Sequence, residues 1–196
     1  YSSSYKLYIY NVYNSGTVTS GGNSNAIGYN DGSSGYFNYS NIYYRENCAT
    51  NVINIGGTAD NTTKYATVFK ATEEERFDLH LNLNEYVLYN PTYSGQTLKY
   101  WGPDQDGYPS FVTGETNTIT LDLDGGTGGA VYSTKYYVGA YYVLPITMPV
   151  KAGYNLTGWT ATGSISGSGT SNQNALIIQP DYAGELLVTA QWEISE

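Results

Sequence analysis

Cysteine, histidine and charged residues are scarce in this chain. Its 196 residues include one cysteine, Cys48, and one histidine, His80, and only 13% of them are charged. A single cysteine excludes an intrachain disulfide, and one histidine with one cysteine cannot supply the usual ligand set of a zinc site. We expect Cys48 to be a small buried apolar residue.

Basic residues are fewer than acidic ones. The chain has eight Lys and Arg and 17 Asp and Glu, which gives a net charge of −9. A protein that binds nucleic-acid phosphates needs a stripe of basic residues on its surface. The sequence therefore predicts no nucleic-acid partner. It also contains no apolar run of about 18 residues, so we expect no membrane insertion within this chain. Because it begins with Tyr1 rather than Met, we expect a processed or excised chain.

Tyrosine and glycine are abundant instead, with 23 copies of each. Tyrosine combines an apolar ring with a polar hydroxyl, which suits a surface that has few ions. An acidic, lysine-poor and Thr/Asn/Tyr-rich composition suits a secreted β-protein. We therefore expect a secreted protein.

The first part of the chain shows the alternation of β-strands. Residues Tyr5–Val12 alternate, and Phe77–Leu83 places Phe or Leu at every second position, so both segments are predicted strands. The acidic run Glu73–Glu75 before the second segment either opens a short helix or forms a solvated turn. With no long helical pattern and no repeat of 20–50 residues recognised, we predict a mainly β chain. Residues 1–116 are predicted to form a β-sandwich-like domain.

Residues 117–196 are predicted to form a second, smaller β-domain. Ile119, Leu121 and Leu123 are expected to point inward from a strand, and Asp124-Gly125-Gly126 is expected to form a turn with positive φ. The last strand is expected at 186–192, with Leu187 and Trp192 as its buried anchors.

Four short motifs follow one another in this second part. They are Leu-Asp-Leu-Asp-Gly-Gly from Leu121, Leu144-Pro145, Gly-Tyr-Asn-Leu-Thr-Gly-Trp from Gly153, and Ala-Gln-Trp from Ala190. Over residues of about 117–193 this order resembles the Listeria–Bacteroides (internalin B-type) surface repeat. The resemblance implies a β-grasp-like fold, an extracellular location, a role in adhesion or in spacing other domains, and no catalytic residues. The Asp122-Leu123-Asp124 segment and the Ser/Gly-rich stretch 163–171 depart from the family pattern. Because of these differences, the resemblance does not predict which face of the module binds a ligand.

Catalytic groups are few. His80 lies on the polar face of the predicted Phe77–Leu83 strand, and no Gly-x-Ser-x-Gly elbow accompanies it, so we expect a surface histidine. The acidic residues Glu73–Glu75 and Glu85 could supply paired carboxylates for glycoside chemistry, but such a run more often forms a solvated face. We therefore predict that the chain is not an enzyme.

A weak candidate for Ca²⁺ lies in the loop Asp104-Gln105-Asp106-Gly107. Oxygen ligands at alternate positions before a glycine turn suit this ion. Gly102 and Thr113 occupy two positions where a complete calcium loop has ligands, so Asp104 and Asp106 remain weak metal candidates.

Aromatic pairs give the clearest binding signal. Tyr43, Tyr44, Tyr100, Trp101 and Tyr108 could stack on sugar rings or form a protein interface, where Tyr and Trp are enriched. The alternative is that these rings fill the cores, because larger aliphatic residues are scarce.

The sequence thus predicts a non-enzymatic, extracellular structural or adhesive surface protein: a spacer, a fibre subunit, or an ectodomain that binds a protein or glycan ligand. One alternative is a subunit of a filament or virion surface that self-associates through the strand Tyr5–Val12, since a terminal strand can pair with an open sheet edge. A second alternative is a carbohydrate-binding module.

Overall fold

The computed structural model describes residues 7–19, 25–30, 37–55, 58–60, 66–93, 95–162, 165–166 and 175–196. The chain divides into two compact units, Tyr1–Val87 and Leu88–Glu196. Strands dominate both, and α1 (Glu73–Tyr89) is the one helix in the described part of the chain. The predicted mainly β class is confirmed. Within these residues, no helix has the length and apolar character that crossing a bilayer requires.

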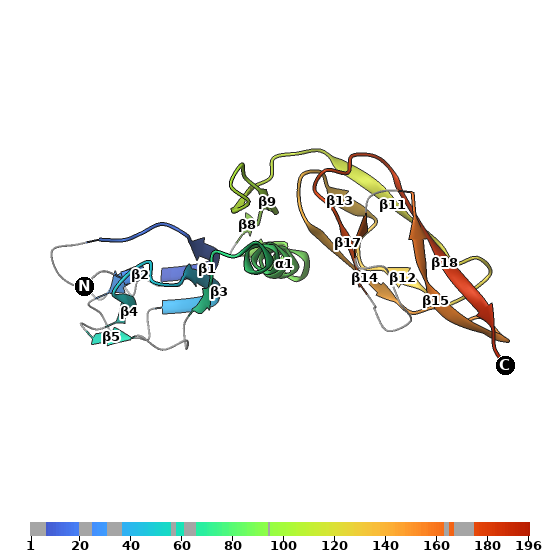
Figure 1. Ribbon diagram of the computed structural model, residues 1–196, viewed down its shortest axis with the longest axis horizontal. Helices are drawn as coiled ribbons and strands as arrows, with labels where there is room; N and C mark the ends of the chain where they lie inside the picture. The colour runs from blue at the N-terminus through green and yellow to red at the C-terminus, as the bar shows by residue number, and fades with distance from the viewer. Residues whose placement is uncertain are drawn as a thin grey trace. The chain divides into compact units, whose positions relative to one another are not determined.

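The N-terminal unit consists of two three-stranded sheets between which the chain alternates (Figure 1). In one sheet β3 (Phe37–Arg45) pairs in parallel with β1 (Leu7–Asn14) and with β6 (Thr67–Phe69). In the other, β4 (Asn51–Ile55) pairs in parallel with β2 (Asn25–Asn30) and antiparallel with β5 (Thr58–Asp60). Successive passes of the chain therefore stack on one another, as in a β-solenoid; we call this arrangement the parallel coil.

The parallel coil differs from the expected arrangement. A β-sandwich of the predicted kind pairs its strands antiparallel, whereas β1, β3 and β6 are all parallel. The stacked partners Leu7 and Phe37 lie 30 positions apart, and Tyr43 and Thr67 lie 24 apart. The unit thus has a structural period within the range in which no sequence repeat was recognised.

Asn41 links three elements of this unit. Asn11 and Asn41 occupy equivalent places in β1 and β3 and have φ of 52° and 54°, a conformation that asparagine tolerates better than most residues. Asn41 Nδ2 donates to Asn11 Oδ1 at 2.7 Å and to the Asn82 carbonyl oxygen of α1 at 3.3 Å. Asn41 Oδ1 accepts the hydroxyl of Tyr43 at 2.8 Å. One amide side chain therefore joins β1, β3 and α1.

The segment Phe77–Leu83 is helical, so its prediction as a strand is wrong. It lies inside the 17-residue α1, whose buried residues come in pairs spaced four apart: Leu79 and His80, Leu83 and Asn84, Val87 and Leu88. A spacing of four residues is the period of one helix face. The apolar residues alone did not show this period, because His80 and Asn84 are polar. The predicted surface position of His80 is also wrong, because the side chain is 1% exposed.

Local signals at both ends explain why this segment forms a helix. The backbone N–H of Glu75 donates to Thr72 Oγ1 at 3.3 Å, the contact of an N-terminal cap. Three acidic residues occupy the first turn, where they complement the helix dipole. Asn90 ends the helix, because Pro91 disfavours a helical conformation of the residue before it. Of the two readings of the acidic run, the start of a helix is confirmed.

The C-terminal unit contains two four-stranded sheets. In the first, β11 (Thr116–Asp122) pairs with β13 (Lys135–Tyr137) and, in parallel, with β18 (Leu186–Ile194), which also pairs with β15 (Tyr154–Ala161) (Figure 1). The second has the order β12 (Ala130–Val131), β14 (Tyr142–Thr147), β17 (Ala175–Ile178), β16 (Ile165–Ser166). Ile119, Tyr136, Trp159, Ile178 and Val188 are among the buried residues of its core.

Two hairpins precede these sheets and belong to the same unit. They are β7 (Thr92–Tyr93) with β8 (Gln96–Thr97), and β9 (Trp101–Pro103) with β10 (Pro109–Phe111). Gly102 lies so close to the carbonyl of Gly139 that a Cβ atom would stand 1.9 Å from its oxygen. This contact attaches the second hairpin to the segment after β13. The compact unit therefore begins at Leu88, whereas the sequence placed the boundary after residue 116.

The sequence motifs of this unit meet around Trp192. The turn after β11 has φ of 44° at Asp124 and 79° at Gly125, as predicted. A Cβ atom on Gly126 would lie 2.6 Å from the Trp192 ring, and Trp192 Nε1 donates to the Leu123 carbonyl oxygen at 3.0 Å. Lys151 Nζ donates to the Asp124 carbonyl oxygen at 2.7 Å and lies 5.6 Å from the Trp192 ring centre. We call these residues the Trp192 cluster.

The predicted anchors of the last strand are half correct. Trp192 packs against the core, but Leu187 is 38% exposed, and Leu186, Val188 and Ala190 are the buried residues of β18. Positions 187 and 192 differ by an odd number, so they point to opposite faces of a regular strand. The inward direction predicted for Ile119, Leu121 and Leu123 is confirmed.

The hydrogen bonds of Asn41 can be separated from its backbone conformation. Glycine tolerates positive φ, so Asn41→Gly removes only the side-chain bonds, and we expect it to lower the free energy of unfolding of the N-terminal unit by about 2–4 kcal/mol. Asn47, with φ of 59° on an exposed turn, is the matched control, and Asn47→Gly should change it by less than about 0.5 kcal/mol. Urea unfolding measures both. Equal losses in the two variants would show that the three bonds contribute nothing.

The two glycines of the Asp124-Gly125-Gly126 turn should respond differently to substitution. Gly126→Ala collides with the Trp192 ring, and we expect it to destabilise the C-terminal unit by about 1–3 kcal/mol and to shift the tryptophan emission. Gly125→Asn keeps a residue that tolerates positive φ and meets no atom closer than 3.7 Å, so its cost should stay below about 1 kcal/mol. Thermal unfolding with fluorescence detection compares them, and a larger loss for Gly125→Asn would contradict the assigned packing.

Candidate functional site

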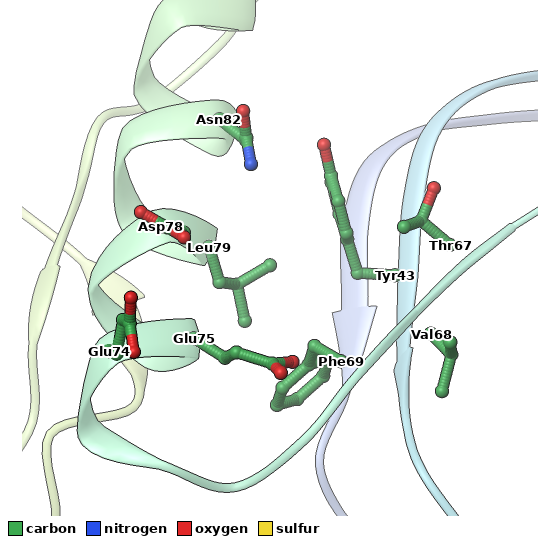
Figure 2. Close-up of a pocket in the computed structure, with 9 residues that line it drawn as sticks. All are labelled: Tyr43, Thr67, Val68, Phe69, Glu74, Glu75, Asp78, Leu79 and Asn82. Carbon is green, nitrogen blue, oxygen red and sulfur yellow. The ribbon is translucent and has the colours of Figure 1, made fainter.

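A pocket of about 360 Å³ lies within the N-terminal unit, between α1 and the strands β3 and β6. Figure 2 shows its lining side chains. The strands contribute Tyr43, Thr67, Val68 and Phe69, and the helix contributes Glu74, Glu75, Asp78, Leu79 and Asn82. One wall is therefore mainly polar and helical, and the other combines aromatic and aliphatic side chains.

The helical wall follows from residue spacing. Glu74, Asp78 and Asn82 are four positions apart, as are Glu75 and Leu79, so they form neighbouring rows along one side of α1. In Figure 2 the side chains of Leu79 and Asn82 extend from α1 toward Tyr43. Because α1 was predicted as a strand, the sequence did not place Asp78 and Asn82 together. The capping pattern Thr72-x-x-Glu75 was the signal that would have found them.

The strand wall is held by neighbouring rings and by Asn41. Tyr43 and Thr67 are direct partners in β3 and β6. Phe69, 4% exposed, makes an edge-on ring contact with Tyr13, with centres 6.4 Å apart. The Tyr43 hydroxyl donates its hydrogen to Asn41 Oδ1, so its oxygen lone pairs remain available as acceptors. The wall is thus fixed before any ligand arrives.

The pocket carries negative charge that is only partly compensated. Glu75 Oε2 accepts the Lys70 backbone N–H at 2.6 Å, and Lys70 Nζ lies 4.0 Å from Glu75 Oε1. The Lys70 side chain is 63% exposed, so this ion pair contributes little. Burial, and secondarily the charge of Glu85, raise the pKa of Tyr43. Near neutral pH the tyrosine is therefore a neutral group beside carboxylates.

These groups are suited to binding a polar ligand. The pocket combines carboxylate acceptors, the Asn82 amide, which both donates and accepts, and the Thr67 hydroxyl. His80 does not line it and is buried. Among the described residues, no three His, Cys, Asp or Glu side chains are grouped so that they could hold a metal ion.

The aromatic residues singled out from the sequence do not form one site. Tyr43 lines the pocket, but its neighbour Tyr44 packs against the small core of Ile42 and Ala66. Tyr100 and Trp101 belong to the C-terminal unit. Tyr100 stacks on Tyr137 with ring centres 4.6 Å apart, and Trp101, 7% exposed, packs on Phe111 at 4.1 Å. Of the two alternatives left open for Trp101, a buried ring is the one that the structure shows.

Tyr108 and the weak calcium candidates lie at the tip of the β9–β10 hairpin. Asp104 Oδ1 accepts the backbone N–H groups of Asp106 and Tyr108, both at 2.9 Å. Gly107 completes this tight turn with φ of 78°. Tyr108 is half-buried, whereas both aspartates are exposed. The carboxylate of Asp104 thus holds the turn together through backbone hydrogen bonds.

Comparison with protein-family models, curated proteins and solved structures found no match to this chain. The chemistry of the pocket is therefore inferred from its own side chains.

Alkaline pH should destabilise the N-terminal unit through Tyr43. Its pKa is raised above the ordinary 10.0, so the folded state holds the proton more tightly than the unfolded state. The stability that this contributes is complete below about pH 10 and is lost as the pH rises through the folded value. In Tyr43→Phe, which has no proton to lose, the free energy of unfolding should fall less between about pH 9 and about pH 11.5.

Urea unfolding across that range measures the effect. Tyr132→Phe, at an exposed tyrosine of the C-terminal unit, is the control. A pH dependence of Tyr43→Phe identical to that of the unmodified chain would contradict the assignment.

Proposed function

We propose that this chain is a non-enzymatic, extracellular structural or adhesive protein of the cell surface. In this proposal the parallel coil acts as a rigid spacer and ends in a helix-covered ligand pocket. The C-terminal unit acts as a β-grasp-like surface repeat module.

The Trp192 cluster is the observation that carries this proposal. Two of the four motifs on which the surface-repeat resemblance depends meet there, the turn at Asp124–Gly126 and the terminal Trp192, and Lys151, two residues before the third motif, contacts both. Lys151 Nζ also lies 4.7 Å from the Tyr154 ring centre. Residues up to about seventy positions apart in the sequence thus pack together in one cluster. The parallel pairing of β11 with β18 is compatible with a β-grasp-like module, whose first and last strands are neighbours.

The parallel coil favours a spacing role for the N-terminal unit. Stacked parallel strands extend along one direction and contact mainly their neighbours. The bond between Asn41 and Asn11 adds side-chain order to the backbone pairing, as asparagine ladders do in stacked sheets. Such an element resists bending and suits a protein that holds a binding site away from a surface.

A non-enzymatic role is favoured by the position of His80. General acid–base catalysis needs a group within reach of the substrate, and His80, the only histidine of the chain, is buried in the face of α1. Among the described residues that line the pocket, no histidine, cysteine or lysine accompanies the carboxylates.

Surface exposure on intact cells tests the proposal. Antibodies raised against the folded chain should label unpermeabilised cells of the organism that encodes it, and brief protease treatment of intact cells should remove that signal. An internal protein with a known location is the control. Labelling seen only after permeabilisation would refute the extracellular location.

Strand-paired assembly is the second candidate function. The strand β1 has β3 on one side only, and no strand pairs with its other edge among the described residues. The predicted self-association segment Tyr5–Val12 overlaps β1, although residues 5 and 6 lie outside the described part. An open parallel edge can accept another strand. Sedimentation velocity and electron microscopy over a concentration series distinguish the two: filaments favour assembly, and a constant monomer favours the spacer.

A further inference from the structure

We propose that the pocket between α1 and the β3–β6 edge binds a single neutral pyranose ring, such as the terminal sugar of a glycan. This inference rests on the proposed adhesive function, for which it names the class of ligand. It is carried by the volume of the pocket, by the contrast between its two walls, and by the fixed position of Tyr43.

The volume suits one sugar ring. At about 360 Å³ the pocket is at the lower end of the range of small-molecule sites. It opens within one compact unit, since all nine lining residues belong to Tyr1–Val87. A longer glycan would place only its terminal ring inside and leave the rest in solvent.

The two walls match the two kinds of surface that a pyranose presents. Such a ring has patches of C–H groups and a rim of hydroxyl groups that both donate and accept. The strand wall offers apolar surface through the ring of Tyr43, and Leu79 on the helical wall adds to it. Asp78 and Asn82, one helical turn apart on α1, offer carboxylate and amide groups on the other wall. A hydroxyl that donates to a carboxylate forms a charge-assisted bond, stronger than a neutral one.

The position of Tyr43 is set without a ligand. Its hydroxyl is bonded to Asn41, which is in turn bonded to Asn11 and to α1. A sugar that docks against this ring therefore orders few side chains, and little binding energy is lost to their immobilisation.

The charges of the pocket disfavour other ligand classes. A phosphate or carboxylate ligand would meet acidic side chains and would find no basic partner among the described residues that line the pocket. For a cation, Glu75 is already engaged by the backbone and the ammonium of Lys70. Glu74 and Asp78 are exposed, so salt screens their attraction for a charged ligand. A neutral polyol uses the same carboxylates as hydrogen-bond acceptors and does not depend on net charge.

Titration of the full chain with simple methyl glycosides tests the proposal. The probes are the methyl pyranosides of glucose, galactose, mannose and N-acetylglucosamine, followed by calorimetry and by NMR of the protein. At least one should bind saturably with a Kd of about 0.1–10 mM, and the affinity should be nearly unchanged by salt. Asn82→Ala and Asp78→Ala, both at exposed helix positions that leave the core intact, should each weaken binding about tenfold.

Asp181→Ala, at an exposed aspartate of the C-terminal unit, is the matched control and should leave the affinity unchanged. The proposal is overturned if no glycoside binds up to about 50 mM, or if binding survives both helix substitutions. Binding of Nα-acetyl-lysine amide in place of the sugars, suppressed by salt, would also overturn it. None of these outcomes affects surface labelling of intact cells, so failure of the sugar site remains distinguishable from failure of the proposed function.

Discussion

The N-terminal unit depends on the saturated hydrogen bonding of one amide side chain. Both hydrogens of Asn41 Nδ2 have acceptors, Asn11 Oδ1 in the neighbouring strand and the Asn82 carbonyl oxygen in the helix, and Asn41 Oδ1 accepts the Tyr43 hydroxyl. Asn11 is buried and Asn41 half-buried, and polar groups removed from water are stabilising only when such partners are present. These hydrogen bonds give a physical reason for the positive φ of Asn11 and Asn41 inside their strands. Without that conformation the amide would not reach β1, α1 and the pocket wall together.

The sequence predicted the strand-rich character of the chain but missed the order in which the strands stack. Asn11-Val12-Tyr13 in β1 and Asn41-Ile42-Tyr43 in β3 are similar triplets at equivalent places. They are too short to be recognised as a repeat. Stacking of parallel strands requires similar shapes at each level and places few demands on the residues of the connections, so the spacing changes from 30 positions at Leu7–Phe37 to 24 at Tyr43–Thr67. The helix was missed for a related reason. Tertiary contacts bury His80 and Asn84, whereas a search for an apolar pattern expects residues such as Leu or Val at buried positions.

The C-terminal motifs were more predictable because their constraints are local. Positive φ at Asp124 and Gly125 is a property of the turn itself, and asparagine, aspartate and glycine are the residues that accept it. The role of Gly126 is different, since it depends on a tryptophan that follows it by more than sixty positions, and only packing reveals it. The wrong assignment of Leu187 shows where such reasoning fails. Alternation along a strand predicts which side chains share a face, but it does not predict which of the two faces is buried. In β18 the buried face is the one that carries Trp192, whose ring N–H donates to the Leu123 carbonyl oxygen in the turn.

The candidate binding site results from the way the parallel coil is covered. The sheet of β1, β3 and β6 has a face that another element must cover. The helix α1 supplies that cover, with Leu79 and Leu83 buried and the Asn82 carbonyl bonded to Asn41. The helix does not fill all the space beside β3 and β6, however, so a groove remains that Tyr43, Thr67, Asp78 and Asn82 line. Because the groove is bordered on one side by a rigid sheet and on the other by solvent-facing helix positions, its polar lining can change without loss of the coil. A coil covered in this way can therefore keep its fold while the residues that line the groove vary.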